Sequence, residues 1–87
     1  MTTKKLTFHT DSGHGWLEVS IEDIRELCIE NSISRYSYTA NGRVYLEEDC
    51  DASLYFANAK DNGWVINMTE KYHAGDCFIR NLPRWSI

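Results

Sequence analysis

Apolar and polar residues alternate in two short runs near the start of the chain. In residues 4–10, Leu6 and Phe8 alternate with threonine and histidine, and the run GWLEVS at residues 15–20 alternates in the same way. A period of two is typical of β-strands that bury one face. The segment DSGHG between the runs is rich in turn-forming residues, so the two strands are predicted to form a β-hairpin.

A helical pattern begins at Ser20. Ser20 and Asp23 form a weak capping box, because a serine hydroxyl accepts a hydrogen bond from the backbone N–H three residues later. From there the apolar residues recur on one stripe and the charged residues on the other. The pattern predicts a helix of about ten residues that ends near Asn31. Its apolar stripe consists of Ile21, Ile24, Leu27 and Cys28.

The dipeptide Asn41-Gly42 separates two further alternating runs. It is the strongest short-range signal for a hairpin, because both residues tolerate the positive φ angles of a tight turn. Tyr36 and Tyr38 are expected on one face of the strand before this turn.

The acid-rich stretch EEDCD follows the fourth predicted strand and precedes a helix predicted from ASLYFANAK. Asp49 or Asp51 is expected to cap that helix, and Gly63 is expected to follow its C-terminus. The remaining segments WVINMTEKY and DCFIRNL are predicted to be two final strands joined by HAGD, the last one ending at Pro83.

The predicted order of elements is ββαββαββ. Short turns join each pair of strands, which favours antiparallel pairing. The expected fold class is α+β, with an antiparallel β-sheet and two short helices. Residues 1–87 are expected to form one compact domain, because a chain of this length buries roughly 60% of the surface that it exposes when unfolded.

The formal net charge of −4 narrows the functions to consider. A protein whose main task is to hold phosphate backbones needs an excess of lysine and arginine, so direct nucleic-acid binding is not expected. The three cysteines are odd in number and lack CxxC spacing, which favours reduced thiols. The sequence shows no signal peptide or apolar membrane span, so a soluble, cytoplasmic protein is expected.

His9, Asp11 and His14 lie close together in the sequence and are one candidate for metal chemistry. Imidazole and carboxylate groups suit zinc or a redox metal, and the acids from Glu47 to Asp51 could add further ligands. The spacing matches no specific metal motif. The simpler interpretation is a strand histidine, a turn aspartate and an exposed histidine, so no cofactor is predicted.

His73 and Cys77 form a His-x₃-Cys pair, which is a second candidate. Cys28 or Cys50 could join this pair, either as a further metal ligand or as part of a cysteine nucleophile site. Acids surround Cys50 and should raise the pKa of its thiol, which disfavours the reactive thiolate. Cys28 and Cys77 are better explained as small buried hydrophobic residues. The sequence also lacks GxSxG, P-loop, GxGxxG and HExxH motifs, so an enzyme is not expected.

The segments near the two ends of the chain carry five basic residues, Lys4, Lys5, Lys71, Arg80 and Arg84. If the terminal strands are adjacent, these residues and nearby aromatic rings could form a small surface for single-stranded bases. Basic residues from separate strands need not form one patch, so an ordinary mixed surface is the favoured interpretation.

Acidic residues are concentrated on the first predicted helix and at the start of the second. If both helices cover one side of the sheet, these acids form a negative surface that attracts a basic partner protein. Acidic helix faces that serve solubility explain the pattern equally well. Exposed tyrosines are expected to be the anchors of such a surface. The predicted partner-binding residues are Glu22, Glu26, Tyr45, Glu47, Glu48, Asp49, Asp51 and Tyr55.

The segments HTDSGHGWLEV, ISRYSY and YLEEDCDASLYF resemble a family of small proteins carried by bacteriophages, prophages and other mobile elements. The resemblance covers roughly the first two-thirds of the chain and does not include the tail from Trp64 onward. It implies a phage accessory protein that binds and modulates a host protein, such as a component of a CRISPR–Cas-like defence system. It implies no catalytic role for any residue.

Overall fold

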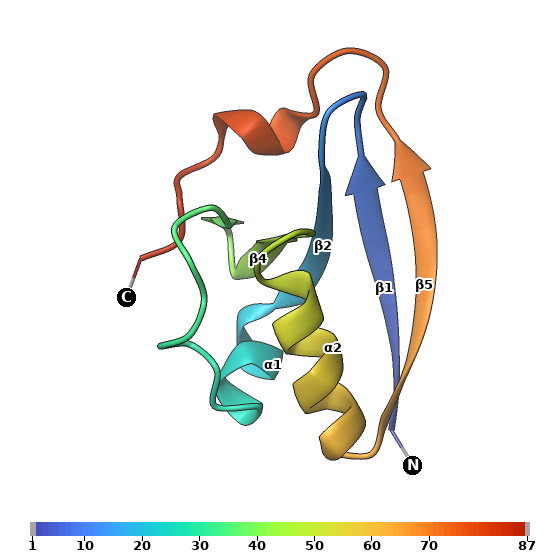
Figure 1. Ribbon diagram of the computed structural model, residues 1–87, viewed down its shortest axis with the longest axis vertical. Helices are drawn as coiled ribbons and strands as arrows, with labels where there is room; N and C mark the ends of the chain where they lie inside the picture. The colour runs from blue at the N-terminus through green and yellow to red at the C-terminus, as the bar shows by residue number, and fades with distance from the viewer. Residues whose placement is uncertain (1, 87) are drawn as a thin grey trace.

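Five strands form a single mixed sheet in the order β3-β4-β2-β1-β5 (Figure 1). The computed structural model describes residues 2–86, and no helix within them is long and apolar enough to span a membrane. The strands are β1 (Thr2–Thr10), β2 (Gly15–Ser20), β3 (Tyr38–Ala40), β4 (Arg43–Glu47) and β5 (Trp64–Tyr72). The helices are α1 (Ile21–Glu26), α2 (Ala52–Asp61) and the short 3₁₀ helix η1 (Phe78–Asn81). The order ββαββαβ before η1 confirms the α+β class but lacks the eighth predicted element, a final strand.

Both predicted hairpins are present. β1 and β2 pair antiparallel, and the Asp11 N–H donates to the His14 carbonyl at 3.0 Å within the turn between them. β3 and β4 pair antiparallel around Asn41 and Gly42, whose φ angles are 54° and 78°. Positive φ at both positions is what a two-residue type I′ turn requires, so local sequence determines this turn.

The helix α1 begins where the sequence predicts but ends early. The Ser20 hydroxyl accepts a hydrogen bond from the Asp23 backbone N–H at 3.2 Å, as in the expected cap. The helix then stops at Glu26 and does not reach Asn31. The cause is Cys28, which has a φ of 58°, in the left-handed region that commonly terminates helices.

The end of α1 is a Schellman motif with cysteine in the position usually taken by glycine. The Ile29 N–H donates to the Ile24 carbonyl at 3.2 Å, and the Cys28 N–H donates to the Arg25 carbonyl at 3.0 Å. Ile24 and Ile29 are buried in the same cluster and supply the hydrophobic contact of the motif. Cys28 is exposed, so the prediction that it is buried is wrong.

The helix α2 begins directly after Asp51, but without the predicted side-chain cap. The Asp51 carboxylate instead accepts hydrogen bonds from the Ser34 N–H at 3.1 Å, from the Ser34 hydroxyl at 2.7 Å and from the Ser37 hydroxyl. It therefore joins the loop before β3 to the start of α2. Gly63, with a φ of 77°, follows the C-terminus of α2 as predicted.

The strand β5 pairs with β1 in parallel, which corrects the prediction of a purely antiparallel sheet. The pairing runs from Thr2 opposite Trp64 to Thr10 opposite Tyr72. β4 is antiparallel to β2 and β2 is antiparallel to β1, so β4 and β1 point the same way. Because α2 leads the chain back along the sheet, β5 repeats the direction of β4 and β1 (Figure 1).

The segment 76–82, predicted to be a final strand, forms η1 and its flanks. Its backbone bonding is local, as in the 3.1 Å hydrogen bond from the Arg80 N–H to the Cys77 carbonyl. Bonds between residues three apart are typical of a 3₁₀ helix. Pro83 therefore does not end a strand, and its carbonyl accepts a hydrogen bond from the Thr39 N–H at 2.9 Å at the edge of β3.

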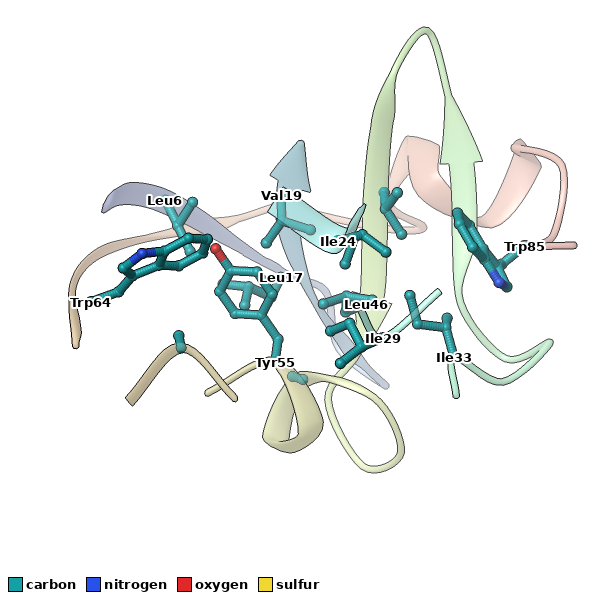
Figure 2. Packing of buried hydrophobic residues seen from close by; sticks show 13 residues of the cluster. Leu6, Leu17, Val19, Ile24, Ile29, Ile33, Leu46, Tyr55, Trp64 and Trp85 are labelled. Atoms are coloured by element: carbon teal, nitrogen blue, oxygen red, sulfur yellow. The ribbon is translucent and has the colours of Figure 1, made fainter. Parts of the chain in front are cut away.

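The alternating strand residues divide between two buried clusters, one on each face of the sheet. The larger cluster includes Leu17 from β2, Ile24 from α1 and Tyr55 from α2, so both helices cover the same face (Figure 2). Figure 2 shows the Tyr55 ring reaching from α2 toward Leu6 and Leu17.

The smaller cluster lies on the opposite face, under the C-terminal segment that contains η1. It contains Trp16, Tyr45, Cys77 and Ile79. Trp16 directly precedes Leu17 in β2, and neighbouring strand residues point to opposite faces, so Trp16 lies on the other side of the sheet from Leu17. The predicted burial of Cys77 is confirmed, since its exposed fraction is 0%.

Candidate functional site

A pocket of about 350 Å³ lies on the face of the sheet that the C-terminal segment covers. Residues from the β1–β2 turn, from the strands β2 to β4 and from the segment around η1 contribute to its lining. A volume of this size suits one side chain or a small molecule. The residues that determine its chemistry are Trp16, Tyr36, Tyr38, Glu47, Asp49 and Arg84.

Two guanidinium groups already lie over aromatic rings of the pocket. The central carbon of the Arg80 guanidinium is 5.3 Å from the Trp16 ring centroid, and that of Arg84 is 5.1 Å from the Tyr38 ring centroid. These contacts are attractive because the negative face of an aromatic ring meets a cation. Tyr36 is 63% exposed and is the most accessible aromatic ring of the pocket.

Asp11 holds Arg80 in place. Arg80 donates from Nε to Asp11 Oδ2 at 2.7 Å and from a terminal nitrogen to Oδ1 at 2.9 Å, a bidentate pair. The same carboxylate accepts from the N–H groups of Gly13, His14 and Cys77, each at 3.0 Å. The hydrogen bonds from Arg80 and Cys77 hold the pKa of Asp11 far below its ordinary value. The hydrogen bond to Asp11 in turn raises the pKa of Arg80.

The predicted metal set of His9, Asp11 and His14 is not brought together. The Asp11 carboxylate is occupied by Arg80 and by backbone N–H groups, as in the turn role that the sequence also suggested. His14 is exposed and lies at the pocket. His9 is buried on β1 and belongs to a different cluster.

The acid-rich stretch after β4 divides into buried and exposed residues. Glu47 and Asp51 are only 8% and 3% exposed, so they are not part of an open acidic surface as the sequence suggested. Glu47 accepts a hydrogen bond from the Asp49 N–H at 3.0 Å, and the carboxylate of Asp51 binds the loop before β3. Glu48 and Asp49 are exposed, and Asp49 also lines the pocket.

The predicted negative surface is divided between two ends of the sheet. Glu22 and Glu26 are exposed on α1, which begins directly after Ser20 at the end of β2. Glu47 lies opposite Trp16, near the start of β2. The acids of α1 and those after β4 are therefore separated by the length of these strands, and they do not form one flank.

Tyr45 and Tyr55 are buried, with exposed fractions of 7% and 0%, so the prediction that they are exposed anchors is wrong. The Tyr45 ring packs edge-on against Phe78 at 5.8 Å between centroids. The Tyr55 hydroxyl donates to Asp23 Oδ2 at 3.1 Å. Burial raises the pKa of both tyrosines, and in Tyr55 the charge of Asp23 adds to the effect. Tyr36 is the exposed tyrosine of the pocket.

Cys50 lines the pocket, but its surroundings disfavour a nucleophile. A hydrogen bond to Glu47 is the largest cause that raises the pKa of its thiol, followed by burial and by the charges of nearby acids. A higher pKa lowers the fraction of reactive thiolate. The raised pKa agrees with the prediction from sequence.

The basic residues near the two chain ends have separate partners. Lys4 Nζ is 3.0 Å from Asp23 Oδ1, and Arg80 is paired with Asp11. Arg84 donates to a backbone carbonyl on the loop before β3 at 3.0 Å. This arrangement favours the mixed surface over a continuous basic patch.

Local sequence patterns gave no signal for the pocket as a whole, because its residues come from distant segments. Trp16 and Arg84, for example, are 68 positions apart in the sequence and line the same pocket only because of where the C-terminal segment lies. Comparison of the chain with family models, with curated proteins and with solved structures found no match. The function is therefore argued from the geometry of the pocket.

Proposed function

We propose that this protein acts by binding a partner protein and that the pocket receives an arginine side chain of that partner. A planar guanidinium group binds well where an aromatic face and a carboxylate are both within reach. Tyr36 offers an exposed ring and Asp49 an exposed carboxylate at the same pocket. This combination is the observation that carries the proposal.

The balance of charge in the pocket favours a cation. Asp11 neutralises Arg80 within the protein. The carboxylates of Glu47 and Asp49 then outnumber the guanidinium of Arg84 in the lining. The net charge of −4 acts in the same direction, because a negative protein attracts a basic surface before contact.

The size of the pocket favours a single side chain over a longer segment. Its volume of about 350 Å³ is near the lower end for ligand pockets. One deeply inserted arginine is a common centre of a protein interface, and less specific contacts surround it. The exposed Glu48 beside the pocket would belong to that surrounding rim.

The resemblance to phage and mobile-element proteins supplies the biological context. The pocket takes residues from each segment of that resemblance: His14 and Trp16 from GHGWL, Tyr36 and Tyr38 from YSY, and Asp49 from YLEEDC. A host defence protein that handles nucleic acid, such as a CRISPR–Cas-like component, uses arginines to contact phosphates. Occupying one of those arginines is the mode of inhibition that follows from the proposal.

Isothermal titration calorimetry with short blocked peptides tests the proposal. A peptide with one arginine is expected to bind with a Kd on the order of 1 mM, as for one well-placed side chain. A citrulline peptide, which keeps the shape but lacks the charge, is expected to bind roughly tenfold more weakly. Tighter binding of a glutamate peptide than of the arginine peptide would refute the proposal.

Two variants and two matched controls locate the binding site. Asp49→Asn and Tyr36→Ala should each lower the affinity for the arginine peptide by roughly threefold to tenfold, because the first removes the carboxylate and the second the aromatic ring. Glu48→Gln removes an exposed neighbouring acid outside the pocket lining, and Tyr72→Ala removes a tyrosine of similar exposure on β5. If Asp49→Asn and Glu48→Gln lost equal affinity for the arginine peptide, the peptide would be responding to the net charge of the protein and not to the pocket.

Metal binding is a second candidate function, and a different observation favours it. One potential ligand atom from each of His9, His73 and Cys77 lies within 4.8 Å of the other two. None of these three residues lines the arginine pocket, so the two candidate functions are independent.

A further inference from the structure

The parallel pairing of β1 and β5 brings together two histidines that are 64 positions apart in the sequence. The register places Thr10 opposite Tyr72, and the His73 N–H continues the ladder by donating to the Thr10 carbonyl at 2.8 Å. As a result, His9 Nδ1 and His73 Nε2 are 2.9 Å apart. Cys77, the N-cap residue of η1, brings a reduced thiol to the same place.

The second nitrogen of the His9 ring determines which atom faces the cluster. His9 Nε2 is 2.7 Å from Glu18 Oε1. Because a carboxylate only accepts hydrogen bonds, Nε2 carries the hydrogen. In the neutral ring the lone pair is then on Nδ1, the nitrogen that faces His73. In the absence of metal, His73 Nε2 then donates a hydrogen bond to His9 Nδ1 at 2.9 Å. A metal ion between the two rings would replace that hydrogen, and each facing nitrogen would bind it through a lone pair.

Glu18 is itself fixed in position. Its other oxygen accepts a hydrogen bond from Arg43 Nε at 2.9 Å. A carboxylate that orients a histidine in this way is the usual partner of a metal-binding histidine, because it fixes the ring and makes it a stronger ligand. The chain Arg43–Glu18–His9 therefore has the form of support found around metal sites.

We propose that His9, His73 and Cys77 bind a zinc ion, through the two facing imidazole nitrogens and the thiolate sulfur. In a tetrahedral zinc site, the usual bond lengths separate two nitrogens by roughly 3.3 Å and a nitrogen from a sulfur by roughly 3.6 Å. The ligand atoms here lie between 2.9 Å and 4.8 Å apart. Side-chain movements of roughly 1 Å are enough to reach the zinc distances.

The surroundings of the cluster suit a bound zinc ion. Phe78 meets both imidazole rings edge-on, with centroid distances of 5.5 Å to His9 and 5.7 Å to His73. Cys77 is fully buried and His73 is only partly buried, so the side of His73 is the route for the ion and for a water as fourth ligand. Zinc would tie η1 to β1 and β5. The proposal does not rest on the arginine pocket.

Cobalt(II) titration of the tag-free protein, after removal of metal with a chelator, tests the proposal. One equivalent of cobalt should give the visible bands of a tetrahedral site and a thiolate-to-cobalt charge-transfer band. Zinc should remove these bands by displacing cobalt, because it binds such sites more tightly. It should also raise the melting temperature of the metal-free protein. Absence of a thiolate-to-cobalt band in the folded wild-type protein would overturn the proposal.

Matched variants assign the ligands. Cys77→Ser should abolish the charge-transfer band, and His73→Ala should weaken zinc binding by roughly a hundredfold, as for loss of one of three ligands. Cys50→Ser and His14→Ala remove residues of the same types elsewhere and should leave the spectrum unchanged. If Cys77→Ser fails to fold, the zinc affinity of His73→Ala still tests the assignment, because His73 is only partly buried. Unchanged zinc affinity in His73→Ala, or loss of the band in Cys50→Ser, would refute the assignment.

Discussion

Arg80 donates two hydrogen bonds to the carboxylate of Asp11, at 2.7 Å and 2.9 Å, and this pair connects η1 to the turn after β1. The Arg80 guanidinium also lies over the ring of Trp16. The contact that secures the C-terminal segment therefore also shapes the pocket. Folding and the proposed binding of a partner depend on the same pair of charges.

Asp11 is expected to make the protein sensitive to acid. Its pKa is held far below the ordinary value of 3.8, first by Arg80 and then by the Cys77 N–H. A carboxyl group with a lowered pKa in the folded state contributes stability above its unfolded pKa, and loses it as the pH falls toward the folded-state pKa. The free energy of unfolding, measured in urea, should fall more steeply below about pH 4 in the wild type than in Asp11→Asn. If the free energy of unfolding depended on pH in the same way in both proteins, this role of Asp11 would be contradicted.

Asp51→Ala is expected to destabilise the protein by about 3 kcal/mol, because it leaves buried hydrogen-bond donors of Ser34 and Ser37 without their acceptor. Asp51 is only 3% exposed, so water cannot replace the carboxylate without rearrangement. The exposed Asp49 is the control, and Asp49→Ala should change the free energy of unfolding by less than about 0.5 kcal/mol. Similar losses for the two variants in urea denaturation would show that Asp51 has no special role.

Cys28→Gly is expected to stabilise the protein by about 1 kcal/mol, because glycine adopts the left-handed φ of 58° without the steric cost that a side chain carries. Cys28→Ala is the control, since alanine keeps that cost and should give no gain. Thermal unfolding of the two variants under reducing conditions measures the difference. An equal gain from alanine would point to the thiol and not to the backbone.

Glu18→Gln is expected to weaken zinc binding by roughly tenfold to a hundredfold, because the amide orients His9 less firmly than the carboxylate does. The variant leaves the three proposed ligands in place. Its cobalt complex should therefore keep the thiolate charge-transfer band while its affinity falls. Unchanged affinity would show that the contact of Glu18 with His9 serves the fold alone.

The elements with local signals were predictable from the sequence. Asn41 and Gly42 adopt the positive φ angles of their turn, and Ser20 accepts from the Asp23 N–H. In both cases the residues that determine the structure are neighbours in the chain. The end of α1 was missed because Cys28 occupies a position where the usual signal is glycine.

The remaining errors come from contacts between distant segments. The segment DCFIRNL was predicted to be a strand, but the Cys77 N–H donates to the Asp11 carboxylate and residues 78–81 form a 3₁₀ helix. His73 and Cys77 were recognised as a pair from their spacing, whereas the third member, His9, is adjacent only because β5 lies parallel to β1. Parallel pairing depends on how α2 returns the chain, and no short stretch of sequence encodes it.

The acid-rich stretch after β4 illustrates the same limit for the candidate site. Asp49 and Asp51 are the same residue type two positions apart, yet Asp49 is exposed at the pocket and Asp51 is buried against the loop before β3. Composition identifies a surplus of acids. Only the packing of that loop separates the carboxylates that are free to meet a partner from those that hold the fold.

Nuclear magnetic resonance of the tryptophan indole N–H groups tests the arginine pocket most directly. The Trp16 indole N–H has no hydrogen-bond partner within residues 2–86, so its signal is free to respond when the pocket fills. Titration with the arginine peptide should shift the Trp16 signal saturably and leave that of Trp64, beside α2, unchanged. A Trp16 signal that stays fixed while the peptide binds elsewhere would contradict the account.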